Sequence, residues 1–269
     1  MKEWFQIIRP LNAVMSGVSV LIVTLSLGRS LLNILVVLGF IVTFLTTAGG
    51  NVLNDYFDRE VDIINHPERP IPSGKISPSK ALIYAGVLFS ISLFVAIFIG
   101  LVPFLIDILA IFLLYIYESK TKNIGIYGNI TISFLLLMLF IFTGSIFNKY
   151  ELPLILGSMA FFATLGREIT KDVEDMAGDF NRKTLPKKIG KGNALLIASI
   201  FYLIGILISS IPYVFHYFGL YYIIAVAVAD IIFIYAAIIQ FKSPHKGQNA
   251  AKYAMILGLI SYIIGGISK

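Results

Sequence analysis

Long apolar runs separated by short polar segments make up most of the chain. A helix needs about 20 apolar residues to cross a hydrocarbon core of about 30 Å. Nine stretches approach this length: roughly 11–28, 31–50, 81–100, 102–117, 127–147, 152–169, 194–211, 219–241 and 251–267. The stretches at 102–117 and 152–169 are short, and we expect them to tilt or to end in the headgroup region. The pattern predicts an all-α, polytopic membrane protein with nine transmembrane helices in a single domain over 1–269.

Composition supports a membrane protein and excludes several kinds of chemistry. The chain is 58% hydrophobic and 13% charged, whereas a soluble domain has about 45–50% apolar and about 25% charged residues. It has no cysteine, which excludes disulfides, thiolate metal sites, iron–sulfur clusters and cysteine nucleophiles. The three histidines, His66, His216 and His245, lie far apart in the sequence, which argues against a histidine-rich zinc site.

The first residues do not read as a cleavable signal peptide, because the apolar run continues past any small-residue cleavage site. Trp4, Phe5, Ile7 and Ile8 precede Pro10. This segment is either a short helix lying in the membrane interface or an ordinary entry into the first span.

Basic residues are concentrated on one side of the predicted spans. Eighteen of the 21 lysines and arginines fall in the N-terminal segment and in the loops after the second, fourth, sixth and eighth spans. The positive-inside rule makes this side cytoplasmic, with the N-terminus inside and the C-terminus outside the cell membrane. The net charge of +6 then reflects topology and attraction to anionic lipid. We expect no nucleic-acid partner, and no obligate protein partner is evident.

Acidic residues form two short clusters on the predicted cytoplasmic side. Ten of the 15 lie in residues 55–68 and 168–179. Both clusters contain aspartates spaced i, i+3 and i+7: Asp55, Asp58 and Asp62 in the first, and Asp172, Asp175 and Asp179 in the second. On a helix these offsets place three carboxylates within about 60° of each other.

Like charges this close destabilise a helix, so a repeated cluster needs a reason. Mg²⁺ prefers oxygen ligands and usually shares them with substrate phosphates. Two such faces opposing each other would hold two or more Mg²⁺ ions around a diphosphate. The alternative is a coincidental pair of acidic helix ends. Glu60 and Glu174 point away from the shared faces, and we expect them to be solvated or paired with basic side chains.

Cations flank both clusters. Arg69 follows the first, Arg182 follows the second, and Lys120 and Lys122 occupy the loop after the fourth span. Arginine offers a forked set of donors to phosphate and lysine offers a compact charge. Such cations would hold an anionic headgroup and stabilise a departing diphosphate. The alternative is that they only set the topology.

The motifs resemble those of the UbiA superfamily of intramembrane prenyltransferases. The resemblance rests on Asn-Asp-x-x-Asp-x-x-x-Asp at 54–62, the aspartate-rich motif at 172–179, Arg-Pro-Ile-Pro-Ser-Gly at 69–74 and Thr-Leu-Pro at 184–186. It covers nearly the whole chain. It implies an all-α bundle with a lipid-accessible active-site cavity and a Mg²⁺-dependent transfer of a prenyl chain from its diphosphate to an acceptor.

The resemblance also implies roles for individual residues. It assigns the binding of Mg²⁺ and diphosphate to Asn54, Asp55, Asp58, Asp62, Asp172, Asp175 and Asp179. One aspartate of the second motif, Asp175 or Asp179, would orient or deprotonate the acceptor. Tyr115 and Tyr117 would support the site or shield an allylic cation with their ring faces. Further candidates for substrate contact are Asn51, Arg69, Lys120, Lys122, Arg167, Lys171 and Arg182.

The acceptor is harder to predict. The chain is most similar to the archaeal branch of the family, whose enzymes transfer a geranylgeranyl group to the free hydroxyl of geranylgeranylglyceryl phosphate and so form the second ether bond of archaeal lipids. The phosphate of that acceptor suits the extra cations at Arg167, Lys171 and Arg182. An aromatic or quinone-precursor acceptor is the alternative within the family. A secondary transporter is the alternative outside it, with Asp230 and Asp107 as the charges within its spans.

Overall fold

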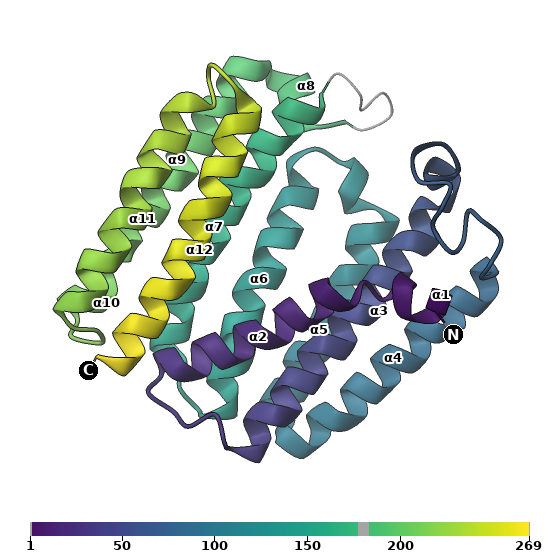
Figure 1. Ribbon diagram of the computed structural model, residues 1–269, viewed down its shortest axis with the longest axis horizontal. Helices are drawn as coiled ribbons and strands as arrows, with labels where there is room; N and C mark the ends of the chain where they lie inside the picture. The colour runs from purple at the N-terminus through teal and green to yellow at the C-terminus, as the bar shows by residue number, and fades with distance from the viewer. Residues whose placement is uncertain (1, 177–182, 269) are drawn as a thin grey trace. The chain divides into compact units, whose positions relative to one another are not determined.

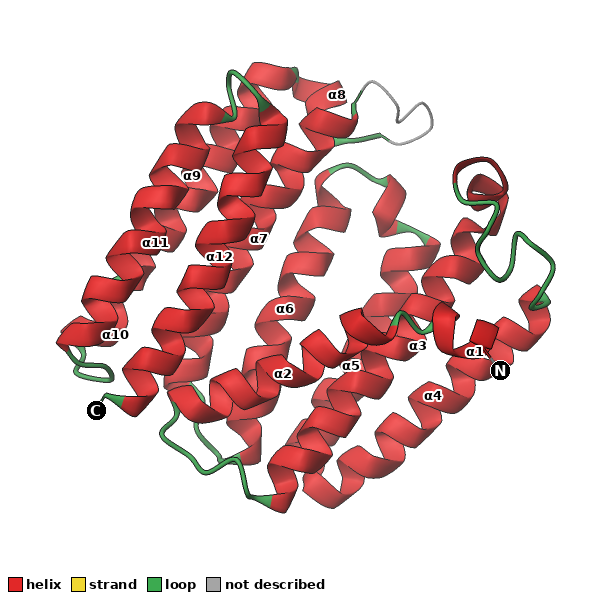
Figure 2. Cartoon of the chain, in the orientation of Figure 1, coloured by secondary structure: helices red, strands yellow, loops and turns green. Residues whose placement is uncertain are grey.

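The computed structural model describes residues 2–176 and 183–268, and within these ranges the chain is helical (Figure 2). An isolated β-bridge between Ile124 and Lys183 is the one extended pairing in the described residues. Eight of the described helices are long and apolar enough to cross a membrane. A ninth apolar helix, α2, corresponds to the first predicted span but has only 17 residues. The predicted class, an all-α polytopic membrane protein, is confirmed, whereas nine full-length spans are not.

The chain divides into two compact units, of which the first comprises residues 1–21, 31–119 and 145–147. Its helices, labelled in Figure 1, are α1 (Lys2–Ile7), most of α2 (Pro10–Ser26), α3 (Ile34–Asn65), α4 (Pro78–Ile99) and α5 (Leu101–Ser119). Asn33 caps α3 by accepting from the backbone N–H of Leu35 at 2.9 Å, and prolines start α2 and α4, where a missing N–H is harmless.

The second unit comprises residues 22–30, 120–144 and 148–269. It contains the short 3₁₀ turn η1 (Thr121–Asn123), most of α6 (Ile126–Ile146), α7 (Glu151–Asp175), α8 (Leu185–Ile189), α9 (Lys191–Ser209), α10 (Ile211–Val214), α11 (Leu220–Ile239) and α12 (Pro244–Ile267). Each predicted span therefore corresponds to one helix of the structure.

Two helices continue well beyond their predicted apolar spans. α3 has 32 residues, which at 1.5 Å per residue is about 48 Å, against a hydrocarbon core of about 30 Å. Its last turns carry the first acidic motif. α7 likewise continues from the predicted end at 169 to Asp175. The acidic motifs are therefore helical through residue 62 in the first case and through residue 175 in the second.

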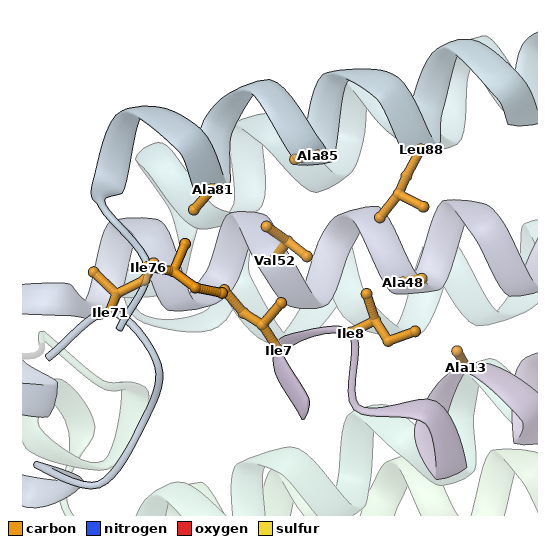
Figure 3. Packing of buried hydrophobic residues seen from close by; sticks show 10 residues of the cluster. All are labelled: Ile7, Ile8, Ala13, Ala48, Val52, Ile71, Ile76, Ala81, Ala85 and Leu88. Atoms are coloured by element: carbon orange, nitrogen blue, oxygen red, sulfur yellow. The ribbon is translucent and has the colours of Figure 1, made fainter. Parts of the chain in front are cut away.

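The core of the first unit includes the N-terminal segment. Ile7 and Ile8 are buried with Val52 of α3 and Ala81 of α4 (Figure 3). Trp4 packs edge-on against Tyr84 of α4, with ring centroids 5.0 Å apart. Burial of Ile7 and Ile8 shows that this part of the segment packs on protein.

The second unit is held by close helix packing and by a buried polar network. Gly166 lets α7 approach α9, because an added Cβ would lie 2.7 Å from the ring of Tyr202 and 3.0 Å from the carbonyl oxygen of Ala198. The buried amide of Gln240 accepts from Thr170 at 2.6 Å and donates to Ser199 at 2.7 Å. These bonds join α7, α9 and α11 just before the second acidic motif begins.

Candidate functional site

The first acidic motif lies on one face of α3, as its spacing predicts. Asp55 and Asp62, two turns apart, are 2% and 4% exposed. Both reach the same guanidinium: Nη1 of Arg69 is 2.5 Å from Oδ2 of Asp62 and 3.7 Å from Oδ1 of Asp55. The loop after α3 carries Arg69 back to the motif, which explains why an arginine follows it at this distance in sequence.

Asn54 connects this face to three further charged groups. Its Oδ1 accepts from Nη2 of Arg9 at 2.9 Å, and the same nitrogen donates to Oδ1 of Asp55. Its Nδ2 donates to Asp58 at 3.0 Å and to Glu118, the penultimate residue of α5, at 2.9 Å. The acidic motif, Arg9, Arg69 and Glu118 thus form one hydrogen-bonded cluster, which we call the α3 cluster.

The carboxylates of the α3 cluster lie where negative charge is unfavourable. The C-terminal end of a helix carries a partial negative charge, which disfavours carboxylates in the last turns. Burial of an unpaired carboxylate is costly as well. Arg9 and Arg69 offset part of this cost by lying against Asp55 and Asp62. Carboxylates gathered in such a position favour binding of a cation.

The second motif is described only in part. Asp172 accepts from Nδ2 of Asn129 on α6 at 2.8 Å, and Asp175 is exposed at the last residue of α7. Asp179 and Arg182 lie outside the described residues. Glu174 points elsewhere, accepting from Gln248 at 2.9 Å and lying 2.7 Å from Nδ1 of His245, in line with its predicted position off the shared face. Glu60 is exposed beside Arg59, as predicted.

Asn51 and the two tyrosines differ in their surroundings. Asn51 is buried and holds the N-terminal segment, donating to the carbonyl of Ile8 at 2.8 Å. Tyr115 is exposed, and its ring centroid lies 6.0 Å from that of Phe57 in the first motif. Tyr117, two residues further along α5, is half-buried.

The cations of the second unit differ in their surroundings. Lys120 and Lys171 are exposed and Lys122 is partly buried. Arg167 donates to Glu168 at 2.9 Å and to Gln248 at 3.4 Å. Its Nε is buried and makes no hydrogen bond to any described residue.

The donor set of the α3 cluster suits a hard divalent cation. It consists of carboxylate and amide oxygens, which Mg²⁺ prefers, and no nitrogen or sulfur ligand is needed. No three carboxylate or imidazole groups of the described residues converge as ligands of one ion. Mg²⁺ commonly binds through one or two carboxylates plus substrate phosphates, so a cluster of this kind fits an ion that arrives with a phosphorylated substrate.

Three residues of these sites were missed by the sequence reasoning. They are Arg9, Glu118 and Asn129, none of which the sequence pattern marks as part of a site. Arg9 and Glu118 reach Asn54 across 45 and 64 positions of sequence. Motif spacing reports only neighbours on one helix, so contacts of this range leave no signal in it.

Comparisons with known proteins agree over almost the full length. The chain is 36% identical to the digeranylgeranylglyceryl phosphate synthase of Methanosphaera stadtmanae, covering 99% of this chain and 100% of the relative. It is 36% identical to the enzyme of that name from Methanothermobacter thermautotrophicus, covering 98% and 96%.

Solved structures share the fold. A structure of a digeranylgeranylglyceryl phosphate synthase in membranes superposes with a TM-score of 0.89 at 32% identity, covering 100% of this chain and 99% of that one. A UbiA homologue from Archaeoglobus fulgidus, bound to GPP and Mg²⁺, superposes with a TM-score of 0.70 at 20% identity, covering 99% and 100%. The UbiA prenyltransferase family matches residues 14–260. The chain therefore belongs to the UbiA prenyltransferase family and is a multi-pass membrane enzyme.

Proposed function

We propose that this chain transfers a geranylgeranyl group from geranylgeranyl diphosphate to the free hydroxyl of geranylgeranylglyceryl phosphate in a Mg²⁺-dependent reaction. The observation that carries the reaction class is the α3 cluster, in which buried carboxylates and forked cations lie together at the end of a membrane helix. The choice of acceptor rests on the relatives named above, which are similar to this chain over nearly its whole length.

In this proposal the carboxylates of both motifs hold the magnesium complex of the diphosphate. Asn54, Asp55, Asp58 and Asp62 serve from α3, and Asp172, Asp175 and Asp179 from the second motif. Mg²⁺ held by these residues would neutralise the charge that develops on the leaving diphosphate. The homologue solved with GPP and Mg²⁺ shares this fold, which supports the choice of metal.

The chain's own side chains supply the remaining steps. Arg69, with Lys120 and Lys122, binds phosphate oxygens as the bond between C1 of the prenyl group and the diphosphate oxygen breaks. The acceptor hydroxyl oxygen forms the new bond to C1, and its proton passes to Asp175 or Asp179. The rings of Tyr115 and Tyr117 shield the allylic carbon from water. Arg167, Lys171 and Arg182 bind the phosphate of the acceptor.

We also propose that this chemistry takes place on the cytoplasmic side of the cell membrane, where the basic loops lie if the N-terminus is inside.

The substrate assignment is tested with purified protein in lipid and radiolabelled geranylgeranyl diphosphate. We expect labelled diether phosphate with geranylgeranylglyceryl phosphate as acceptor, and none in excess EDTA until Mg²⁺ is restored. An aromatic acid such as 4-hydroxybenzoate serves as the competing acceptor. Preferential prenylation of the aromatic acid would reject the proposed acceptor, and full turnover in EDTA would reject the role of Mg²⁺.

A further inference from the structure

Arg9 takes up two oxygens of the first motif that the proposed function assigns to metal binding. Its Nη2 donates to Oδ1 of Asn54 at 2.9 Å and to Oδ1 of Asp55. Asp55 is 3% exposed as a side chain, whereas Arg9 remains 36% exposed. The carboxylate is thus enclosed, while the guanidinium that covers it still reaches the surface.

Contacts of the preceding residues and the backbone conformation of Arg9 fix its position. Ile7 and Ile8 are buried in the core of the first unit, and Asn51 fixes the carbonyl of Ile8. The backbone of Arg9 has φ 47°, a left-handed conformation that is unfavourable for residues other than glycine. Such a conformation persists only where its surroundings enforce it. The turn between α1 and α2 is therefore built to present this side chain to α3.

Arg9 and a divalent cation would compete for these two oxygens. Both are positive, and both would lie within hydrogen-bonding or ligand distance of Asp55 and Asn54, where their charges repel. Arg69 differs from Arg9, because its short contact is to Asp62 and its distance to Asp55 is 3.7 Å.

We propose that Arg9 balances the charge of Asp55 and occupies the amide oxygen of Asn54 while no metal is bound, and that arrival of the metal transfers its guanidinium to a diphosphate oxygen. This inference rests on the proposed function and adds a residue to it. A guanidinium binds phosphate oxygens through the same forked donors that it offers to a carboxylate. Arg9 thus competes with the metal when no diphosphate is present, and it contributes to binding of the metal–diphosphate complex.

The two roles predict effects of opposite sign in Arg9→Gln. Binding of Mn²⁺ alone, measured by loss of the free-ion EPR signal, should become about tenfold tighter than in the unsubstituted chain, since a charge-assisted contact no longer has to break. Binding of the magnesium complex of inorganic diphosphate, measured by calorimetry at saturating Mg²⁺, should become about tenfold weaker. Arg9→Lys keeps the positive charge but lacks the forked donors. Both of its affinities should lie between those of the unsubstituted chain and those of Arg9→Gln.

Arg59→Gln is the matched control. Arg59 lies on α3 within the same motif, but its contacts are the exposed Glu60 and the backbone and ring of Tyr56. This variant removes the same charge without touching Asp55, and both affinities should stay within twofold of the unsubstituted chain.

Docking of the N-terminal segment is checked in the same samples. The chain has one tryptophan, Trp4, which packs on Tyr84, so an unchanged emission spectrum shows that the segment of Arg9→Gln remains in place. If the spectrum changes, Arg9→Lys carries the test, and it must still bind Mn²⁺ more tightly and diphosphate more weakly than the unsubstituted chain.

The outcomes separate this inference from the proposed function. If the unsubstituted chain binds Mn²⁺ and makes product, but the docked Arg9 variant binds Mn²⁺ equally or more weakly, the competition is wrong and the function stands. The same holds if diphosphate binding is unaffected. If the unsubstituted chain binds neither Mn²⁺ nor the magnesium complex of diphosphate, the metal site of the proposed function fails, and the inference with it.

Discussion

Asn54 links three charged groups of the α3 cluster. One amide accepts from Arg9 and donates to both Asp58 and Glu118. The amide has a fixed donor end and a fixed acceptor end, so these three partners define its orientation. An aspartate at this position would retain the acceptor for Arg9 but would place like charges against Asp58 and Glu118. The asparagine that opens the motif therefore has a physical reason.

Asp58 provides the most direct test at this scale. Replacing its carboxylate in Asp58→Asn should lower prenyl transfer by about two to three orders of magnitude, the usual effect of removing one group that stabilises developing charge. The measurement is the rate of labelled product formation by purified, folded protein.

Glu60→Gln is the control for Asp58→Asn. Glu60 lies two residues further along α3 and is exposed, so its loss should leave the rate within about twofold. Equal rates in Asp58→Asn and Glu60→Gln would remove the first motif from the mechanism.

At the scale of elements, Asp107 holds three membrane helices together. Thr46 on α3 donates to its Oδ1 at 2.6 Å, and Ser92 on α4 donates to its Oδ2 at 2.7 Å. The carboxyl group is buried on α5 with both oxygens occupied. These hydrogen bonds explain why an acidic residue lies within a span. Asp107 therefore does not require the transport function that the sequence left as an alternative. Asp230 has a similar partner, Ser209, at 2.7 Å.

Asp107→Ala should destabilise the protein by about 1–3 kcal/mol, the range for buried polar groups that lose a partner. The melting temperature in detergent reports this, and Asp107→Asn, which keeps one acceptor oxygen, should lose less. The folded fraction should retain its specific activity. An inactive variant with an unchanged melting temperature would instead give Asp107 a role in the reaction.

The close approach of α7 and α9 at Gly166 is a second contact between elements that can be tested. Gly166→Ala should destabilise the packing of α7 on α9, because the added Cβ meets the Tyr202 ring and the Ala198 carbonyl. Gly258→Ala on α12 is the control, since nothing lies within 4 Å of its added Cβ. The control should be neutral or stabilised by up to about 1 kcal/mol, because alanine favours helix over glycine. Equal melting temperatures for the two variants would contradict the close approach.

Sequence reasoning performed differently for elements and for contacts. Each predicted span matched one helix, because a run of apolar residues reports the medium directly. The common face of Asp55 and Asp62 followed from helix geometry alone. Arg9 and Glu118 escaped, because their approach to Asn54 depends on how α1, α3 and α5 pack. The burial of Ile7 and Ile8 escaped for the same reason, since an apolar segment looks alike whether lipid or protein covers it.

For the whole molecule, the absence of cysteine makes the orientation directly measurable. We expect Lys188→Cys to react with an impermeant maleimide only from the cytoplasmic side, and Lys149→Cys only from the outside. Both lysines are exposed, and they lie in segments between spans that the positive-inside rule places on opposite sides. Intact spheroplasts and inverted vesicles distinguish the two sides. The unsubstituted chain, which has no thiol, sets the background.

Labelling of both variants from the same side would require an even number of crossings between them, and so would overturn the predicted arrangement of nine spans.

The shortness of α2 has a mechanical consequence. Its 17 residues rise about 26 Å, a few ångströms less than the roughly 30 Å hydrocarbon core. Hydrophobic mismatch of this kind favours thinning of the surrounding bilayer. Residues 10–21 of α2 belong to one unit and 22–26 to the other, and its first residue follows Arg9 directly. Membrane thickness therefore acts on a helix that begins directly after Arg9, the residue whose side chain covers Asp55.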